Sequence, residues 1–134
     1  MADKLMRTVV VMSFFLALAL FSGCGTHGTQ ITDADNGKQI NVKSGDLVTL
    51  TLVSNPTTGY SWQVMDIDKT ILAQNGESEY KQSPGSEGLV GAGGTETFQF
   101  KVVGSGETTL KLGYMRPWES TPPIQTFSIK IVAQ

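Results

Sequence analysis

The alternation of apolar and polar residues along the chain predicts a protein built of β-strands. Five segments alternate with a period of two residues, which places one row of side chains on each face of a strand. Threonine is abundant on the polar face, as is typical of half-buried strands. These strongly predicted strands are residues 47–53, 60–65, 95–103, 108–115 and 125–133. Weaker strands are expected at 30–34, 39–43 and 79–82.

The segments between these strands carry turn residues rather than long helical patterns. Gly, Asn, Asp and Ser cluster at residues 35–37, 44–46 and 104–106, and these residue types favour turns. Only residues 66–73 suggest a helical turn, so parallel strands joined by helices are not expected. About seven or eight strands at this spacing predict an all-β fold, an immunoglobulin-like antiparallel β-sandwich.

The beginning of the chain has the pattern of an export signal. Lys4 and Arg7 precede an apolar run over residues 9–21, which is too short to span a bilayer but fits the apolar core of a signal peptide. The small residues before Cys24 resemble the bacterial lipobox, although Phe21 stands where leucine is usual. The resemblance implies cleavage before Cys24 and lipidation of this cysteine.

This pattern divides the chain into three parts. We expect residues 1–23 to be a signal peptide of the lipoprotein type, residues 24–29 to be the lipidated cysteine and a tether, and residues 30–134 to form one domain. Gly25 follows the cysteine, and by the same resemblance it favours the outer membrane of the bacterial cell envelope, on the periplasmic or surface face. Two alternatives are a secreted protein with an unused lipobox and a buried cysteine in an N-terminal anchor helix.

Composition argues against several classes of function. The chain has 134 residues and a formal net charge of −2, so it lacks the basic excess that nucleic-acid binding requires. Its one cysteine cannot form a disulfide within the chain, and its one histidine, His27, offers little for a zinc site or a catalytic triad. We therefore expect no enzyme activity, no metal and no cofactor.

Three segments between strands are richer in sequence features than simple connections. They are Asn55-Pro56-Thr57-Thr58-Gly59-Tyr60, then residues 84–94 ending in Gly91-Ala92-Gly93-Gly94, and then residues 116–123 beginning with Arg116-Pro117-Trp118. Alternate connections of a sandwich lie at the same end, so we expect these segments together and the short turn at 104–106 at the other end. Decorated loops on a rigid β-scaffold are typical of a binding surface.

Each segment also has a simpler interpretation. The first could be only a turn, the second only a flexible connection, and Trp118 could fold back onto the core. A phosphate-binding loop is disfavoured for the second segment, because it lacks a lysine at the required spacing and no helix follows it. Binding is favoured for the third segment, because prolines stiffen it and because Trp and Arg are enriched at binding hot spots.

In this order and at these positions, the three motifs resemble the chagasin family of cysteine protease inhibitors. The resemblance covers about residues 30–134 and implies an immunoglobulin-like sandwich that inhibits papain-like (clan CA) enzymes reversibly and tightly. It implies that the three loops enter the active-site cleft, with Thr57 and Thr58 nearest to the protease thiolate. It also implies that the glycine motif approaches the enzyme backbone, while Arg116 and Trp118 grip the other side.

Other functions stay open from the residues alone. The same loops could make the protein an envelope immunoglobulin-like binding module for a partner that is not a protease. A hydrolase would need carboxylate pairs such as Asp66 with Asp68 or Glu77 with Glu79, and a structural role at the envelope would leave the loops idle. The partners that we expect are papain-like proteases and, through the lipid anchor only, a membrane; we expect a monomer.

Overall fold

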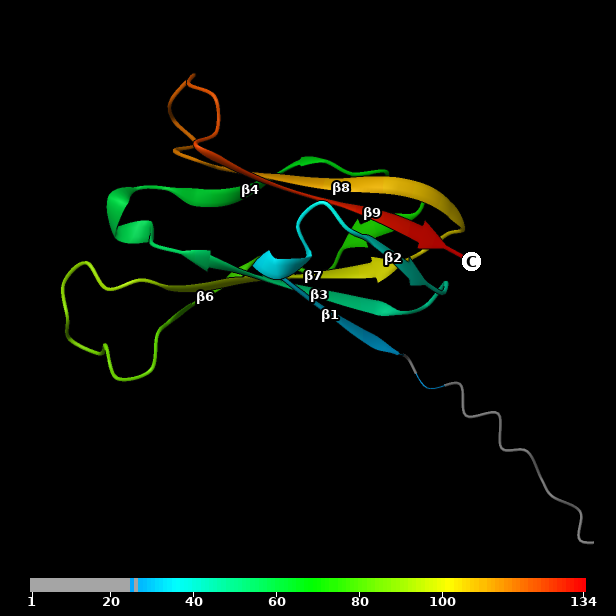
Figure 1. Ribbon diagram of the computed structural model, residues 1–134, viewed down its shortest axis with the longest axis horizontal. Helices are drawn as coiled ribbons and strands as arrows, with labels where there is room; N and C mark the ends of the chain where they lie inside the picture. The colour runs from blue at the N-terminus through cyan, green and yellow to red at the C-terminus, as the bar shows by residue number, and fades with distance from the viewer. Residues whose placement is uncertain (1–24, 26) are drawn as a thin grey trace, which may run out of the picture.

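The protein is a sandwich of two β-sheets that lie face to face (Figure 1). This computed structural model describes residue 25 and residues 27–134, so the predicted signal peptide and Cys24 lie outside the described residues. The strands are β1 (Gly28–Thr32), β2 (Gln39–Val42), β3 (Leu47–Ser54), β4 (Ser61–Asp66), β5 (Leu72–Gln74), β6 (Glu79–Gln82), β7 (Gly94–Val102), β8 (Gly106–Met115) and β9 (Gln125–Ala133). Two 3-10 helices, η1 (Asp33–Asp35) and η2 (Pro56–Thr58), complete the described elements. In this part of the chain, no helix is long and apolar enough to cross a membrane.

The sheet topology confirms the predicted all-β sandwich. One sheet has the strand order β1-β3-β7-β5, with β6 also paired to β7, and the other has the order β2-β9-β8-β4. The expected antiparallel arrangement needs a correction at two pairs, because β1 pairs with β3 and β2 pairs with β9 in parallel. No hairpin joins either pair, so neither is constrained to the antiparallel direction.

The core forms where the inward-facing residues of the two sheets meet. Val48, Leu50 and Leu52 of β3 are fully buried, as are Phe100 of β7 and Leu112 of β8. They alternate with polar residues on the outer faces, which confirms the predicted period of two. Burial of each such side chain contributes roughly 1.5–3 kcal/mol, and this core makes the scaffold of the loops rigid.

Two of the expected segments differ most from the observed elements. Strand β1 begins at Gly28, because Gly28 and Thr29 pair with Leu47 and Val48 instead of lying in the tether. The helical turn expected at residues 66–73 is reduced to one turn, in which the backbone N–H of Leu72 donates to the carbonyl oxygen of Asp68 at 2.9 Å. Leu72 then starts β5, where its side chain is fully buried in the core.

Strand β4 is an edge of its sheet and contains a bulge. Val64 pairs with Leu112 and Asp66 pairs with Lys111, so Met65 is an extra residue on β4. The side chain of Met65 instead lies near Gly113 of β8, where a Cβ atom would be 2.5 Å from its sulfur. The bulge interrupts the regular hydrogen-bonding row of this edge.

The connections of interest gather at one end of the sandwich, on the left of Figure 1. They are the central loop (residues 55–60, between β3 and β4), the glycine loop (residues 83–93, between β6 and β7) and the tryptophan loop (residues 116–124, between β8 and β9). The start of β1 and the C-terminus lie at the other end. We call these two ends the loop end and the turn end.

Candidate functional site

The central loop is a short rigid element. Pro56 begins η2, and Gly59 ends it with a φ of 83°, a conformation that glycine adopts without strain. The hydroxyl of Thr57 donates to the side-chain oxygen of Asn55 at 2.6 Å, and the hydroxyl of Thr58 donates to the Asn55 carbonyl oxygen at 2.8 Å. These contacts fix the loop while Thr57 and Thr58 stay exposed.

Asn55 connects the central loop to its surroundings. Its side-chain amide donates to the carbonyl oxygen of Gly91 in the glycine loop at 3.1 Å. Its backbone N–H donates to the phenolic oxygen of Tyr114, which is buried in β8, at 2.8 Å. One asparagine therefore fixes the positions of two loops relative to the core.

The glycine loop differs in part from the prediction. A hydrogen bond from the Ser83 N–H to the Gly93 carbonyl oxygen (3.1 Å) closes its base. Gly94 is buried in β7 and faces its own chain, because a Cβ atom there would collide with the carbonyl oxygen of Lys81. Ala92 and Gly93 are half-buried, and only Gly91 of this motif is exposed.

The apolar part of the exposed surface of the glycine loop is formed by two residues that sequence reasoning missed. Leu89 is largely exposed and Val90 is fully exposed, just before Gly91. Their signal in the sequence is a pair of apolar residues inside a polar, glycine-rich segment. Exposed apolar side chains side by side at a loop tip are typical of an interaction surface.

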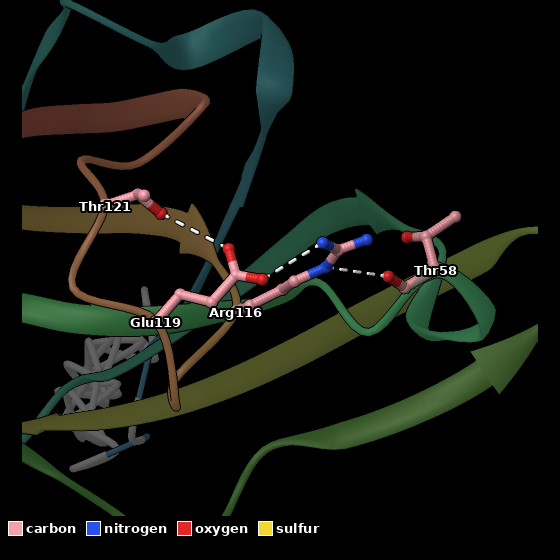
Figure 2. Close-up of polar contacts among 4 residues, drawn as sticks. All are labelled: Thr58, Arg116, Glu119 and Thr121. Carbon is pink, nitrogen blue, oxygen red and sulfur yellow. Dashed lines mark hydrogen bonds and ion pairs between the residues drawn. The ribbon is translucent and has the colours of Figure 1, made fainter.

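Arg116 fastens the tryptophan loop to the central loop (Figure 2). Its Nε donates to the carbonyl oxygen of Thr58 at 3.1 Å, and its Nη1 lies 3.1 Å from Oε1 of Glu119. Its guanidinium group lies 4.6 Å from the centre of the Tyr60 ring, within the range of a cation–π contact. The side chain that was expected to grip a partner thus contacts its own chain.

The Trp118 side chain lies on the surface. It is 71% exposed, so the alternative in which it folds back onto the core is wrong. One edge of its ring covers Gly59, where a Cβ atom would be 2.8 Å from Cη2 of Trp118. Pro117 is exposed beside it. The absence of a side chain at Gly59 therefore leaves the space in which the indole ring lies against the central loop.

Three aromatic rings pack together where the central loop meets the core. Tyr60 lies 5.6 Å from Tyr114, and Trp62 lies 5.1 Å from the same ring, between ring centres. Both distances are typical of favourable aromatic pairs. The predicted strand 108–115 includes Tyr114, but the hydrogen bond between Tyr114 and the central loop was not predicted.

Two observations concern the metal and hydrolase alternatives. In residues 25 and 27–134, no group of three His, Cys, Asp or Glu side chains could hold a metal ion. Hydrogen bonds from the hydroxyl and the backbone N–H of Thr70 hold the pKa of Asp68 below its ordinary value. Asp68 therefore lacks the raised pKa that a general acid requires.

Comparisons with known proteins agree with this architecture. The sequence model described as Chagasin family peptidase inhibitor I42 matches residues 41–131. Chagasin of Trypanosoma cruzi is 40% identical over 90 residues, which are 66% of this chain and 82% of chagasin. Amoebiasin-2 of Entamoeba histolytica is 32% identical over 104 residues, which are 76% of this chain and 82% of that protein.

The same relationship is found among solved structures. The crystal structure of a cysteine protease inhibitor from Entamoeba histolytica has a TM-score of 0.72 and 28% sequence identity, and the match covers 81% of this chain and 96% of the other. The family model matches more than half of the chain, and its members are peptidase inhibitors rather than enzymes. The fold, the sequence relatives and the family model together show that this chain belongs to the chagasin family of cysteine protease inhibitors.

Proposed function

We propose that the protein is a reversible, tight-binding inhibitor of papain-like (clan CA) cysteine proteases, and that its three loops block the active-site cleft. The observation that carries the proposal is the hydrogen-bonded row of loops at one end of the sandwich. Loops that are ordered before binding lose little conformational entropy when a partner docks. Blocking a cleft needs shape rather than a reactive group, so we expect no covalent bond.

In this proposal the central loop enters deepest. It contacts the glycine loop through Asn55 and the tryptophan loop through the Thr58 carbonyl oxygen, so it lies between them. The exposed Thr57 and Thr58 at its tip then face the catalytic cysteine and histidine of the protease. Their contacts with Asn55 keep this tip from moving out of the cleft.

The two flanking loops supply the apolar contacts. Trp118 is a rigid and largely exposed aromatic group, the type of residue that carries most energy in protein interfaces. Leu89 and Val90 form the apolar part of the other flank, and the exposed Gly91 lets the backbone come close to the enzyme. Arg116 contributes by holding the tryptophan loop in place.

Papain provides the direct test. A protein of residues 25–134 should slow the hydrolysis of a dipeptidyl fluorogenic substrate by papain, and dilution should restore the activity. Papain with a small cap on its cysteine should still form the complex, because the thiol takes part in no bond. No inhibition at micromolar concentration would contradict the proposal, and the loops would then serve a partner that is not a protease.

We also propose that Cys24 carries lipid and anchors the protein, as a monomer, in the bacterial cell envelope. Two observations support this: the signal pattern of the first residues, and the start of β1 at the turn end (Figure 1). An anchor there leaves the loops pointing away from the membrane. Cys24→Ser should release the protein from the membrane fraction, whereas a variant that still sediments with membranes would contradict lipidation.

A further inference from the structure

Glu96 is a buried acidic residue that the proposed contacts with a protease do not use. It lies in the inward-facing row of β7, between Gly94 and Phe98, and is only 7% exposed. Its Oε2 accepts hydrogen bonds from the Ser54 hydroxyl (3.3 Å) and the Trp62 backbone N–H (3.1 Å). Its Oε1 accepts a hydrogen bond from the Ser78 hydroxyl at 2.9 Å.

Two of these partners lie in the stems of the central loop, the strands directly before and after it. Ser54 is the last residue of β3, directly before the loop, and Trp62 is the second residue of β4, the strand that follows the loop. The two strands belong to different sheets, so one carboxylate connects the sheets where the loop crosses between them. The indole N–H of Trp62 adds a second link, because it donates to the Val53 carbonyl oxygen at 2.9 Å.

The third partner extends this connection toward the glycine loop. Ser78 directly precedes β6, and β6 and β7 are the two stems of that loop. All three partners of Glu96 are uncharged donors, and within the described residues no buried side-chain oxygen or nitrogen lacks a partner. The Glu96 carboxylate therefore has all its hydrogen-bond partners and connects the strands that carry two of the three loops.

We propose that Glu96 is a positioning residue, whose carboxylate fixes the separation of the stems of the central loop and keeps the loop in the conformation that a protease binds. The inference rests on the proposed function. Without this acceptor, the Trp62 N–H and the Ser54 hydroxyl lose a buried partner, which favours other conformations of the stems. When only a fraction of molecules is competent to bind, the apparent affinity falls by that fraction.

The kinetics of papain binding distinguish positioning from direct contact. Glu96→Ala should lower the association rate constant by about tenfold and leave the dissociation rate constant unchanged, since the bound state is the same once formed. Glu96→Gln should recover most of the lost association rate. The amide oxygen of glutamine can still accept a hydrogen bond, and its NH2 group can donate one to a serine hydroxyl. An unchanged association rate in Glu96→Ala would overturn the inference.

Asp46→Asn is the matched control. Asp46 is 8% exposed, lies at the turn end, and accepts a hydrogen bond from the Lys43 backbone N–H at 2.8 Å. This variant should lower the melting temperature but leave the association rate with papain unchanged. An equal loss of association rate in both variants would show a general effect of stability and overturn the positioning role.

Hydrogen exchange tests the inference without a protease. The N–H groups of Thr58 and Gly59 are hydrogen-bonded inside the central loop, so their exchange should accelerate about tenfold in Glu96→Ala. Unchanged exchange would overturn the role of Glu96 even if the unsubstituted protein inhibits papain. Conversely, faster exchange in a protein that does not inhibit papain would refute only the proposed function. If Glu96→Ala does not fold, Ser78→Ala removes one partner and should cause a smaller change in the same direction.

Discussion

The two ends of the sandwich are joined by different kinds of hydrogen bond. At the turn end, most of the hydrogen bonds between segments pair backbone groups: the Gly45 N–H donates to the Val102 carbonyl oxygen and the Val103 N–H donates to the Ile71 carbonyl oxygen, both at 2.8 Å, while the Thr108 hydroxyl accepts from the Asp68 N–H. At the loop end, the described contacts between loops come from the side chains of Asn55 and Arg116. Backbone pairs form with almost any sequence, whereas side-chain pairs need particular residues.

This difference explains why the recognisable motifs gather at one end. A hydrogen bond between neutral groups contributes about 0.5–1.5 kcal/mol net, and one that involves a charged group contributes about 1.5–3 kcal/mol. A substitution at the turn end therefore changes mainly the free energy of unfolding. A substitution at the loop end also changes the shape that is presented to a partner. Inhibition and stability should consequently respond in different ways at the two ends.

Removal of the exposed indole should have the largest effect on inhibition. Trp118→Ala should raise the inhibition constant for papain about 30-fold, since an aromatic anchor contributes about 2 kcal/mol. The melting temperature should hardly change, because the side chain is mostly exposed. The matched control is Val103→Ala, which truncates a 47% exposed side chain at the turn end and should leave inhibition unchanged. An unaltered inhibition constant in Trp118→Ala would contradict the role of Trp118 as an anchor in the complex.

Two glycine-to-alanine substitutions, one at each end of the sandwich, should affect stability alike but inhibition differently. Gly59 has a φ of 83° and Gly45 a φ of 94°, so alanine at either position should cost about 1–2 kcal/mol of stability. A Cβ atom has open space at Gly45 but meets the Trp118 ring at Gly59. Gly59→Ala should therefore raise the inhibition constant about tenfold, and Gly45→Ala should leave it unchanged. Equal inhibition of papain by both variants would contradict the different roles of the two ends.

Loss of the hydrogen bond between Arg116 and Thr58 should have a smaller effect on inhibition. Arg116→Lys keeps a positive charge near Glu119 but loses the donor at Nε that contacts the Thr58 carbonyl oxygen. We expect inhibition to weaken about fivefold, which corresponds to about 1 kcal/mol for one hydrogen bond. Lys130→Gln breaks an exposed ion pair with Glu107 and should leave inhibition unchanged. An effect of Lys130→Gln as large as that of Arg116→Lys would point to net charge rather than geometry.

The smallest effect should come from acid titration at the turn end. The hydroxyl and N–H of Thr70 lower the pKa of Asp68 in the folded protein, so Asp68 stabilises the fold above the pKa of the unfolded chain. This contribution is lost as the pH falls through the folded pKa. Asp68→Asn should thus lower the denaturation midpoint near neutral pH and flatten its decline toward acid, with inhibition unchanged. A steeper decline of the denaturation midpoint toward acid in Asp68→Asn would contradict the lowered pKa of Asp68.

Strand positions could be predicted because a half-buried strand repeats every two residues. The predicted segments 47–53, 95–103, 108–115 and 125–133 differ from β3, β7, β8 and β9 by at most two residues at either boundary. The directions of β1 and β2 could not be predicted in this way. Both are short, and their partners β3 and β9 are determined by the tertiary arrangement rather than by a local turn.

The position of the three loops could be predicted better than the contacts that their residues make. The three motifs correctly indicated that loops gather at one end, but the interface preference of arginine suggested that Arg116 points at a partner. Its position follows from Thr58 and Tyr60, which lie far away in the sequence. Glu96 did leave a signal, since it is an acidic residue at an inward-facing position of a predicted strand, and such a residue needs several donors around it.

The bulge at Met65 has a consequence for how molecules of this protein meet one another. An uncovered sheet edge presents N–H and C=O groups that can recruit a strand of another chain and start aggregation. The extra residue breaks that row on β4, so a second molecule cannot extend the sheet in register there. The same strand therefore has two tasks along its length: its beginning holds the central loop through Trp62, and its later part carries the interruption of the sheet edge.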